Sequence, residues 1–197
     1  MHANTAGVFK GFYKDRTTGL GRFGGTNADA LSRIKRPIEL AAPILSRFDC
    51  ASQVLQGDAR GVANTIRGLD LAYLDPPYNQ HPYGSNYFML NLLCDYRRPA
   101  EVSRNSGIPA DWRRSAYNAR GQAFEELQAL IEALDAKFVM LSFNNEGFVP
   151  PAELQAFLAR QGHCELVEIP YNTYRGSRNL AGRNLHVVEQ FFLVEKR

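Results

Sequence analysis

A short apolar run that ends in two consecutive prolines constrains the fold of this chain most. Residues 71–74, Leu-Ala-Tyr-Leu, have the composition of a buried strand, and Asp75, Pro76, Pro77 and Tyr78 follow at once. Proline fixes φ and has no backbone N–H, so a strand inside a sheet has to stop here. The sequence therefore predicts a strand whose carboxyl end carries a carboxylate, two rigid residues and an aromatic ring.

Strand and helix patterns alternate along the rest of the chain. Short apolar runs predict strands, and runs with apolar residues three and four apart predict helices. The expected strands are 53–58, 70–74, 137–143, 164–169 and 186–196, and the expected helices are 61–69 (a turn or short helix), 86–96, 122–134 and 151–161. This alternation is typical of an α/β sheet with helices on both faces. The last two strands have no helix between them, which predicts an antiparallel hairpin.

Composition and cysteine usage are those of an ordinary soluble domain. The 197 residues are 45% hydrophobic and 22% charged, and no apolar run approaches the roughly 20 residues of a membrane helix. The N-terminus lacks the apolar stretch of a secretory signal. Cys50, Cys94 and Cys164 are isolated and odd in number, which favours reduced core residues in a cytoplasmic protein over a disulfide framework or a metal site.

Arginine is concentrated in two stretches although the net charge is only +3. Clustered arginines among Ser, Asn and Tyr suit a phosphate backbone, and solvated loops are the other interpretation. The expected loop over 97–119 holds the first cluster, and an acid-free stretch before the last strand holds the second. The candidates for phosphate or base contacts are Arg97, Arg98, Arg113, Arg114, Arg175, Arg178 and Arg183.

The Asp-Pro-Pro-Tyr segment suits chemistry on an exocyclic amine. Open α/β sheets bind ligands at the carboxyl ends of their strands, where this segment lies. The Asp75 carboxylate and the Pro76 carbonyl can each accept one amine hydrogen, which localises the nitrogen lone pair for attack on a methyl group. Tyr78 offers a face on which a flipped base can stack. The alternative interpretation is a turn that only terminates the strand.

Several segments taken in order resemble the Dam-like class of DNA N6-adenine methyltransferases. Besides the Asp-Pro-Pro-Tyr motif, Val-Leu-Gln-Gly-Asp-Ala at 54–59 is similar to a cofactor-pocket strand of that family. Residues 137–147 are similar to its Ser-Tyr-Asn-x-Glu-Gly segment, with Phe143 in place of tyrosine. The resemblance implies a Rossmann-like methyltransferase sheet, S-adenosylmethionine as cofactor and double-stranded DNA as substrate, in a restriction–modification or phage system.

The resemblance also implies roles for individual residues. Asp75 and the Pro76 carbonyl orient and polarise the amine, Pro77 holds the turn and Tyr78 stacks the base. Asp58 and Ala59, together with Asp75, are expected to bind the cofactor, and no metal is required.

One family motif is not found in this sequence. The N-terminal strand–turn–helix that wraps the methionine end of the cofactor is missing, and the opening ANTAGVFKGFYK (residues 3–14) resembles a segment that normally lies well downstream of it. We therefore expect residues 1–50 to be the tail of a target-recognition region and 51–197 to be the C-terminal portion of the catalytic domain, in a truncated or split form. An upstream segment or a second chain would then supply the motif. The alternatives are an inactive fragment, a DNA-binding subunit that requires a partner, or a methyltransferase for cytosine N4 or another amine.

Overall fold

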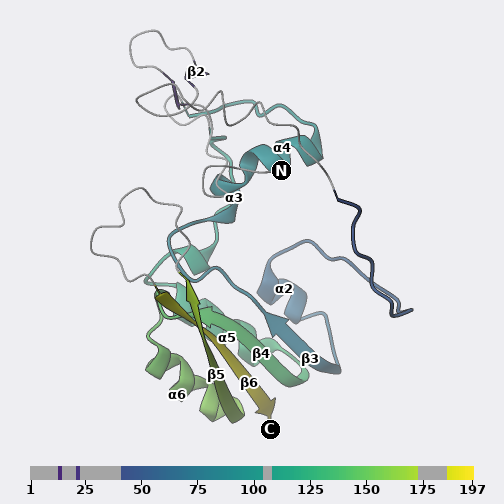
Figure 1. Cartoon of the computed structure of the whole chain (residues 1–197), viewed down its shortest axis with the longest axis vertical. Helices are drawn as coiled ribbons and strands as arrows, with labels where there is room; N and C mark the ends of the chain where they lie inside the picture. The colour runs from purple at the N-terminus through teal and green to yellow at the C-terminus, as the bar shows by residue number, and fades with distance from the viewer. Residues whose placement is uncertain (1–12, 15–20, 23–40, 104–107, 173–185) are drawn as a thin grey trace. The chain divides into compact units, whose positions relative to one another are not determined.

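The computed structural model of the chain describes residues 13–14, 21–22, 41–103, 108–172 and 186–197 (Figure 1). They divide into two compact units. One holds the described residues of 1–50 together with those of 83–114, and the other holds 51–82, 115–172 and 186–197. In the parts of the chain that the structure describes, no helix is long and apolar enough to cross a membrane.

A mixed four-stranded sheet forms the centre of the second unit (Figure 1). Its order is β3 (Leu69–Leu74), β4 (Ala136–Asn144), β6 (His186–Lys196) and β5 (Gly162–Asn172). β3 and β4 run parallel, and β6 is antiparallel to both β4 and β5. The predicted α/β class and the predicted C-terminal hairpin are therefore confirmed.

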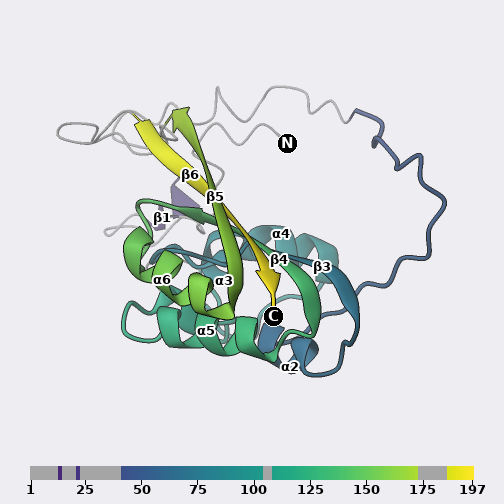
Figure 2. The same cartoon turned by 90° about the horizontal axis from the view of Figure 1, so that it is seen from below.

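Three helices of this unit, α2 (Ala59–Ala63), α5 (Ala123–Ala133) and α6 (Pro151–Gln161), lie on one face of the sheet (Figure 2). The expected stripe on α5 is confirmed, since Leu127, Leu130 and Ile131 are all buried in the core. α6 begins at a proline in its first turn, as the sequence predicts, because the missing N–H has no partner there in any helix.

The first unit contains two short helices and a small hairpin. α3 (Tyr83–Asn86) and α4 (Phe88–Asp95) replace the single helix expected over 86–96. β1 (Tyr13–Lys14) pairs antiparallel with β2 (Gly21–Arg22). Trp112 packs close to Gly84, where a Cβ would lie 3.2 Å from the indole ring, so the tryptophan anchors the chain locally.

The strand expected over 53–58 is wrong. Residues 51–58 are irregular and exposed, and the side chain of Val54 is 94% exposed. A strand is stabilised by pairing with a neighbour, and no described strand pairs with this segment. A helical turn does follow, but α2 begins at Ala59, two residues before the expected start.

Two further expectations about burial are also wrong. Among the described residues, the helices of the sheet-bearing unit lie on one face, and the apolar residues Leu71, Tyr73, Val167 and Ile169 on the opposite face are exposed. β3 is therefore half-buried, with Ala72 as its buried residue. All three cysteines are free, but Cys50 and Cys94 are exposed and are not core residues, whereas Cys164 is half-buried and packs against the core.

Candidate active site

The Asp-Pro-Pro-Tyr segment leaves the sheet at the carboxyl end of β3, where the pairing of Leu74 with Leu141 closes the ladder. Asp75 is exposed, Pro76 is buried, and Tyr78 is half-buried. The strand thus ends where the sequence predicts, with the carboxylate in solvent and the first proline packed inside.

The acceptors of this segment have no partner within the described part of the chain. Neither the Asp75 carboxylate nor the Pro76 carbonyl accepts a hydrogen bond there. Pro76 and Pro77 have no backbone N–H, so neither of them can donate to these oxygens. Both oxygens thus lack a partner among the described residues, one on the exposed Asp75 and one on the buried Pro76.

The backbone after the prolines is held in place by two distant segments. The Tyr78 carbonyl accepts a hydrogen bond from the backbone N–H of Phe148 at 2.8 Å. The Asn79 carbonyl accepts one from the side-chain amide of Asn118 at 2.7 Å. The Asn79 side chain turns back to accept the N–H of His81 at 3.0 Å. No pattern in the sequence predicts the contacts of Phe148 and Asn118, because neither residue belongs to a motif with the loop.

An aromatic contact fixes the tilt of the Tyr78 ring. Its centroid lies 6.0 Å from that of Phe143, and the two planes meet at 62°, an edge-to-face arrangement. Phe143 lies one residue before the end of β4, in the core, with 2% of its surface exposed. Gly147 lies against the same ring, since a Cβ there would approach Phe143 to 2.6 Å. Glycine at this position leaves room for the phenylalanine beneath Tyr78.

Asp58 and Ala59, the expected cofactor residues, begin α2. The Asp58 carboxylate caps the helix by accepting the N–H of Gly61 at 3.0 Å, and both Asp58 and Ala59 are exposed.

The environment of Tyr117 shows where Asp58 lies. Burial, the Glu126 carboxylate and the Asp58 carboxylate raise the pKa of Tyr117 to about 12. Tyr117 belongs to the 3-10 helix η1 (Ala116–Asn118), which also carries the side chain that holds the loop. Asp58 is therefore close to the segment that supports the Asp75–Tyr78 loop.

The carboxylates of Asp58 and Asp75 fit S-adenosylmethionine chemically. Carboxylates suit its positive charge and its hydroxyl and amine hydrogens, and Asp58 and Asp75 are both exposed acids next to this end of the sheet. One oxygen of Asp58 serves the helix cap, and the other has no hydrogen bond among the described residues. In the described part of the chain, no group of three or more His, Cys, Asp or Glu residues is placed to hold a metal ion.

The candidate arginines are divided between what is described and what is not. Arg97, Arg98, Arg113 and Arg114 are exposed, and the Arg114 guanidinium stacks on the Trp112 ring at 4.7 Å. Arg175, Arg178 and Arg183 lie outside the described residues.

Sequence reasoning did not single out Arg120, which lies in the same unit as the loop. Its guanidinium is 4.9 Å from the centroid of the Phe148 ring, and Phe148 is the residue that holds the Tyr78 carbonyl. The positive charge of Arg120 thus lies close to the loop, where it suits a contact with a phosphate.

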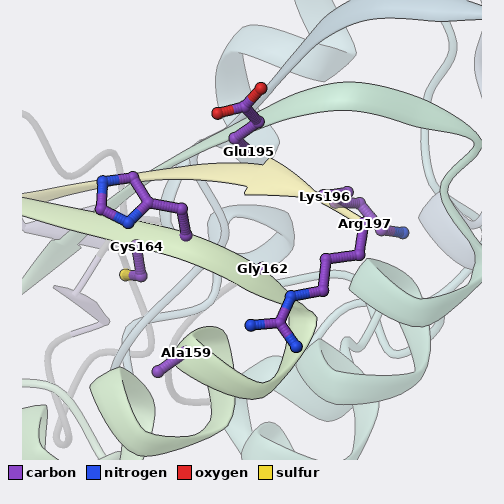
Figure 3. Close-up of a pocket in the computed structure, with 7 residues that line it drawn as sticks. Ala159, Gly162, Cys164, Glu195, Lys196 and Arg197 are labelled. Atoms are coloured by element: carbon purple, nitrogen blue, oxygen red, sulfur yellow. The ribbon is translucent and has the colours of Figure 1, made fainter.

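A cavity of about 500 Å³ lies at the opposite end of the sheet (Figure 3). Its lining includes Gly162 and Cys164 at the start of β5 and Glu195 and Lys196 at the end of β6. These positions pair next to Phe138 near the amino end of β4, so the cavity is remote from Asp75. It takes no part in the candidate active site.

Comparison with known proteins decides the family. A family model for D12 class N6 adenine-specific DNA methyltransferases matches residues 32–147. The chain belongs to this class. The Asp75–Tyr78 loop and β4 both lie inside the matched range. Membership confirms the Dam-like resemblance and implies S-adenosylmethionine as the methyl donor.

Curated relatives of this D12 class chain are methyltransferases of restriction–modification systems. It is 29% identical to the type II methyltransferase M.NlaIII of Neisseria lactamica over 96% of its own length and 54% of the relative. It is 29% identical to the modification methylase StsI of Streptococcus sanguinis, over 76% of its own length and 23% of the relative. It is 30% identical to the modification methylase LlaI of Lactococcus lactis subsp. lactis, over 88% of its own length and 26% of the relative. The chain thus spans about half or less of the length of these relatives. No solved structure matches it.

Proposed function

We propose that this chain carries the base-binding and methyl-transfer loop of an adenine N6 DNA methyltransferase. The observation that supports this most is the availability of the Asp75 carboxylate and the Pro76 carbonyl beside the half-buried ring of Tyr78. A turn that only ended the strand would not require two rigid, unpaired acceptors and an aromatic ring at the carboxyl end of a sheet. Membership of the D12 class supports adenine as the substrate base.

The proposed mechanism assigns one task to each group of the loop. Asp75 accepts one hydrogen of the N6 amine and the Pro76 carbonyl accepts the other, which moves the lone pair from the ring onto nitrogen. Pro77 keeps the two acceptors at a fixed spacing, so no reorganisation is needed when charge develops. Tyr78 stacks on the flipped adenine. Asp58, Ala59 and Asp75 would hold S-adenosylmethionine, which would supply an electrophilic methyl group and leave as S-adenosylhomocysteine. The amine hydrogen that is bonded to the Asp75 carboxylate is released to that carboxylate as a proton.

A methyl-transfer assay with Asp75→Ala tests this assignment. We expect incorporation of labelled methyl groups into DNA to fall by about 10²-fold or more, because the carboxylate acts as a positioned acceptor in the transition state. The fold should be unaffected, since the Asp75 side chain is exposed and has no hydrogen-bond partner among the described residues.

Asp70→Ala, on the strand β3 that leads to Asp75, is the matched control. It removes an exposed aspartate that pairs with Lys137 at 2.6 Å, and it should leave methyl transfer within a few-fold of the parent. If Asp75→Ala also retained activity within a few-fold, the role of Asp75 would be wrong.

We also propose that an upstream segment or a second chain completes the cofactor pocket. Three observations support this: the irregular and exposed segment 51–58, the exposed apolar residues on one face of the sheet, and β3 at the edge of the described sheet. Unpaired strand edges and apolar faces favour association with further structure. Titration calorimetry of residues 1–197 with S-adenosylmethionine should show only weak binding. A micromolar dissociation constant for the isolated monomer would contradict this proposal.

A further inference from the structure

The two prolines limit how the loop that carries the proposed chemistry is held. Pro76 and Pro77 have no backbone N–H, and the pairing of β3 with β4 ends at Leu74. Contacts with other segments support the second side of the loop, after the prolines.

Two consecutive carbonyls provide that second side. Tyr78 is held through its carbonyl by the Phe148 N–H at 2.8 Å, and Asn79 by the side-chain amide of Asn118 at 2.7 Å. The two donors come from separate segments, one after β4 and one in η1. We call this pair of contacts the loop clamp. The Asn118 contact is its only part that a side-chain substitution can remove.

The segment that carries Asn118 is itself tied to the core. Ser115 caps η1 by accepting the N–H of Tyr117 at 3.3 Å, and the Asn118 N–H donates to the Ser115 carbonyl at 3.1 Å. Tyr117 packs against the core, and its hydroxyl donates to the Glu126 carbonyl of α5 at 3.4 Å. A continuous series of contacts thus runs from α5 through η1 to the loop, which gives the clamp a rigid base.

We propose that Asn118 is a positioning residue for methyl transfer. Its amide fixes the backbone that follows Tyr78 and so keeps the tyrosine ring and the two acceptors in a single arrangement. The inference rests on the proposed function and extends it to a residue outside the Asp-Pro-Pro-Tyr motif. Displacements of about 1 Å at a reacting centre can cost roughly 10²-fold in rate, so a support of this kind has a measurable effect.

Asn118→Asp and Asn118→Ala test the clamp without any need for activity. The aspartate has the same shape but places an acceptor against the Asn79 carbonyl, and the alanine removes the donor. We expect hydrogen exchange at the Phe148 amide, the other half of the clamp, to become roughly five- to tenfold faster, with the larger effect for Asp. Exchange at Val139 in the middle of β4 should stay unchanged, which separates local opening from global loss of stability.

Asn64→Ala is the matched control for the exchange experiment. Asn64 is an exposed asparagine at the end of α2, in the same unit, and its side chain makes no hydrogen bond among the described residues. Its substitution should change neither amide. Unchanged exchange at Phe148 in both Asn118 variants would overturn the proposal, and so would an equal acceleration at Val139 and Phe148.

The second measurement is steady-state methyl transfer to DNA by the form of the protein that is active. A positioning role predicts a kcat lower by roughly tenfold or more in Asn118→Asp, with the KM for S-adenosylmethionine unchanged. An unchanged kcat together with faster Phe148 exchange would overturn the positioning role. If the parent transferred no methyl group to adenine, the proposed function would fail, and the exchange experiment would still decide whether Asn118 fixes the loop.

Discussion

Tyr117 should make the stability of the protein depend on pH in the alkaline range. Its pKa is raised to about 12, first by burial and then by the carboxylates of Glu126 and Asp58, while Arg60 acts in the opposite direction. In the unfolded chain the same phenol titrates near its usual pKa of about 10. Between these two values the unfolded state loses the proton and the folded state keeps it.

The sign of the effect follows from this difference in protons bound. Below pH 10 both states are protonated and the contribution of Tyr117 to stability is fully present. Above pH 10 the unfolded state binds fewer protons, so the free energy of unfolding falls as pH rises, until the folded state also titrates near pH 12. At pH 11 the loss is at most about 1.4 kcal/mol, one pKa unit. Because the side chain is only half-buried, solvent screening reduces this to about 1 kcal/mol.

Urea unfolding of the parent and of Tyr117→Phe at pH 9 and pH 11 measures this contribution. The parent should lose about 1 kcal/mol more than the variant between the two pH values. At pH 9 the variant should differ little from the parent, because it loses only a long hydroxyl contact of 3.4 Å to the Glu126 carbonyl. Tyr171→Phe, which removes an exposed phenol, is the control and should follow the parent. If the parent and Tyr117→Phe lost equal stability, the placement of Tyr117 beside the two carboxylates would be refuted.

Further predictions concern the ring, a helix end and the arginines. Tyr78→Phe should retain much of the methyl transfer and Tyr78→Ala should lose most of it, because stacking is worth roughly 1–3 kcal/mol per base. An equal loss of methyl transfer in both variants would show that the tyrosine hydroxyl matters and that the stacking account is wrong. Lys196→Met should lower the free energy of unfolding by about 2–4 kcal/mol. The Lys196 ammonium donates to the carbonyls of Ile131 at 2.8 Å and Leu134 at 2.6 Å, at the end of α5. A urea midpoint equal to the parent's would contradict this prediction. Neutralising Arg175, Arg178 and Arg183 together should reduce the salt dependence of DNA binding by roughly one unit of slope per lost phosphate contact, and an unchanged slope would return them to the solvated-loop interpretation.

The elements that the sequence predicted well are those with a strong local pattern. α5 and α6 have an apolar stripe at helical spacing, and α6 also has a proline at its start. β6 is rich in valine and phenylalanine, and its limits of His186–Lys196 agree with the prediction. In each case the decisive interactions lie within the element or on a single buried face.

The expected strand at 53–58 failed for a physical reason that its composition cannot reveal. Val54 and Leu55 suit a strand, but a strand also requires a neighbour that pairs with its backbone, and none is described. The exposure of Leu71 and Tyr73 on β3 has the same origin, because burial of the second face depends on what packs there. The local sequence sets the preference for a strand, and the segments that pair with it or pack on it decide whether the strand forms and which face is buried.

The candidate site shows the same division. The Asp75–Tyr78 loop was predicted from four consecutive residues, because prolines and a strand end act locally. The contact of Asn118 with the Asn79 carbonyl joins residues 39 positions apart, and the sequence contains no pattern that links them. Contacts of this kind depend on how η1 and β4 pack, so they emerge only from the three-dimensional structure.

Nucleoside mass spectrometry of methylated DNA tests the central claim most directly. The protein, together with whatever segment or chain completes it, is incubated with unmethylated duplex DNA and isotopically labelled S-adenosylmethionine, and the DNA is then digested to nucleosides. The account predicts label in N6-methyldeoxyadenosine, and its loss with Asp75→Ala but not with Asp70→Ala. Label in N4-methyldeoxycytidine, or in adenine to an equal extent with the Asp75 variant, would contradict it.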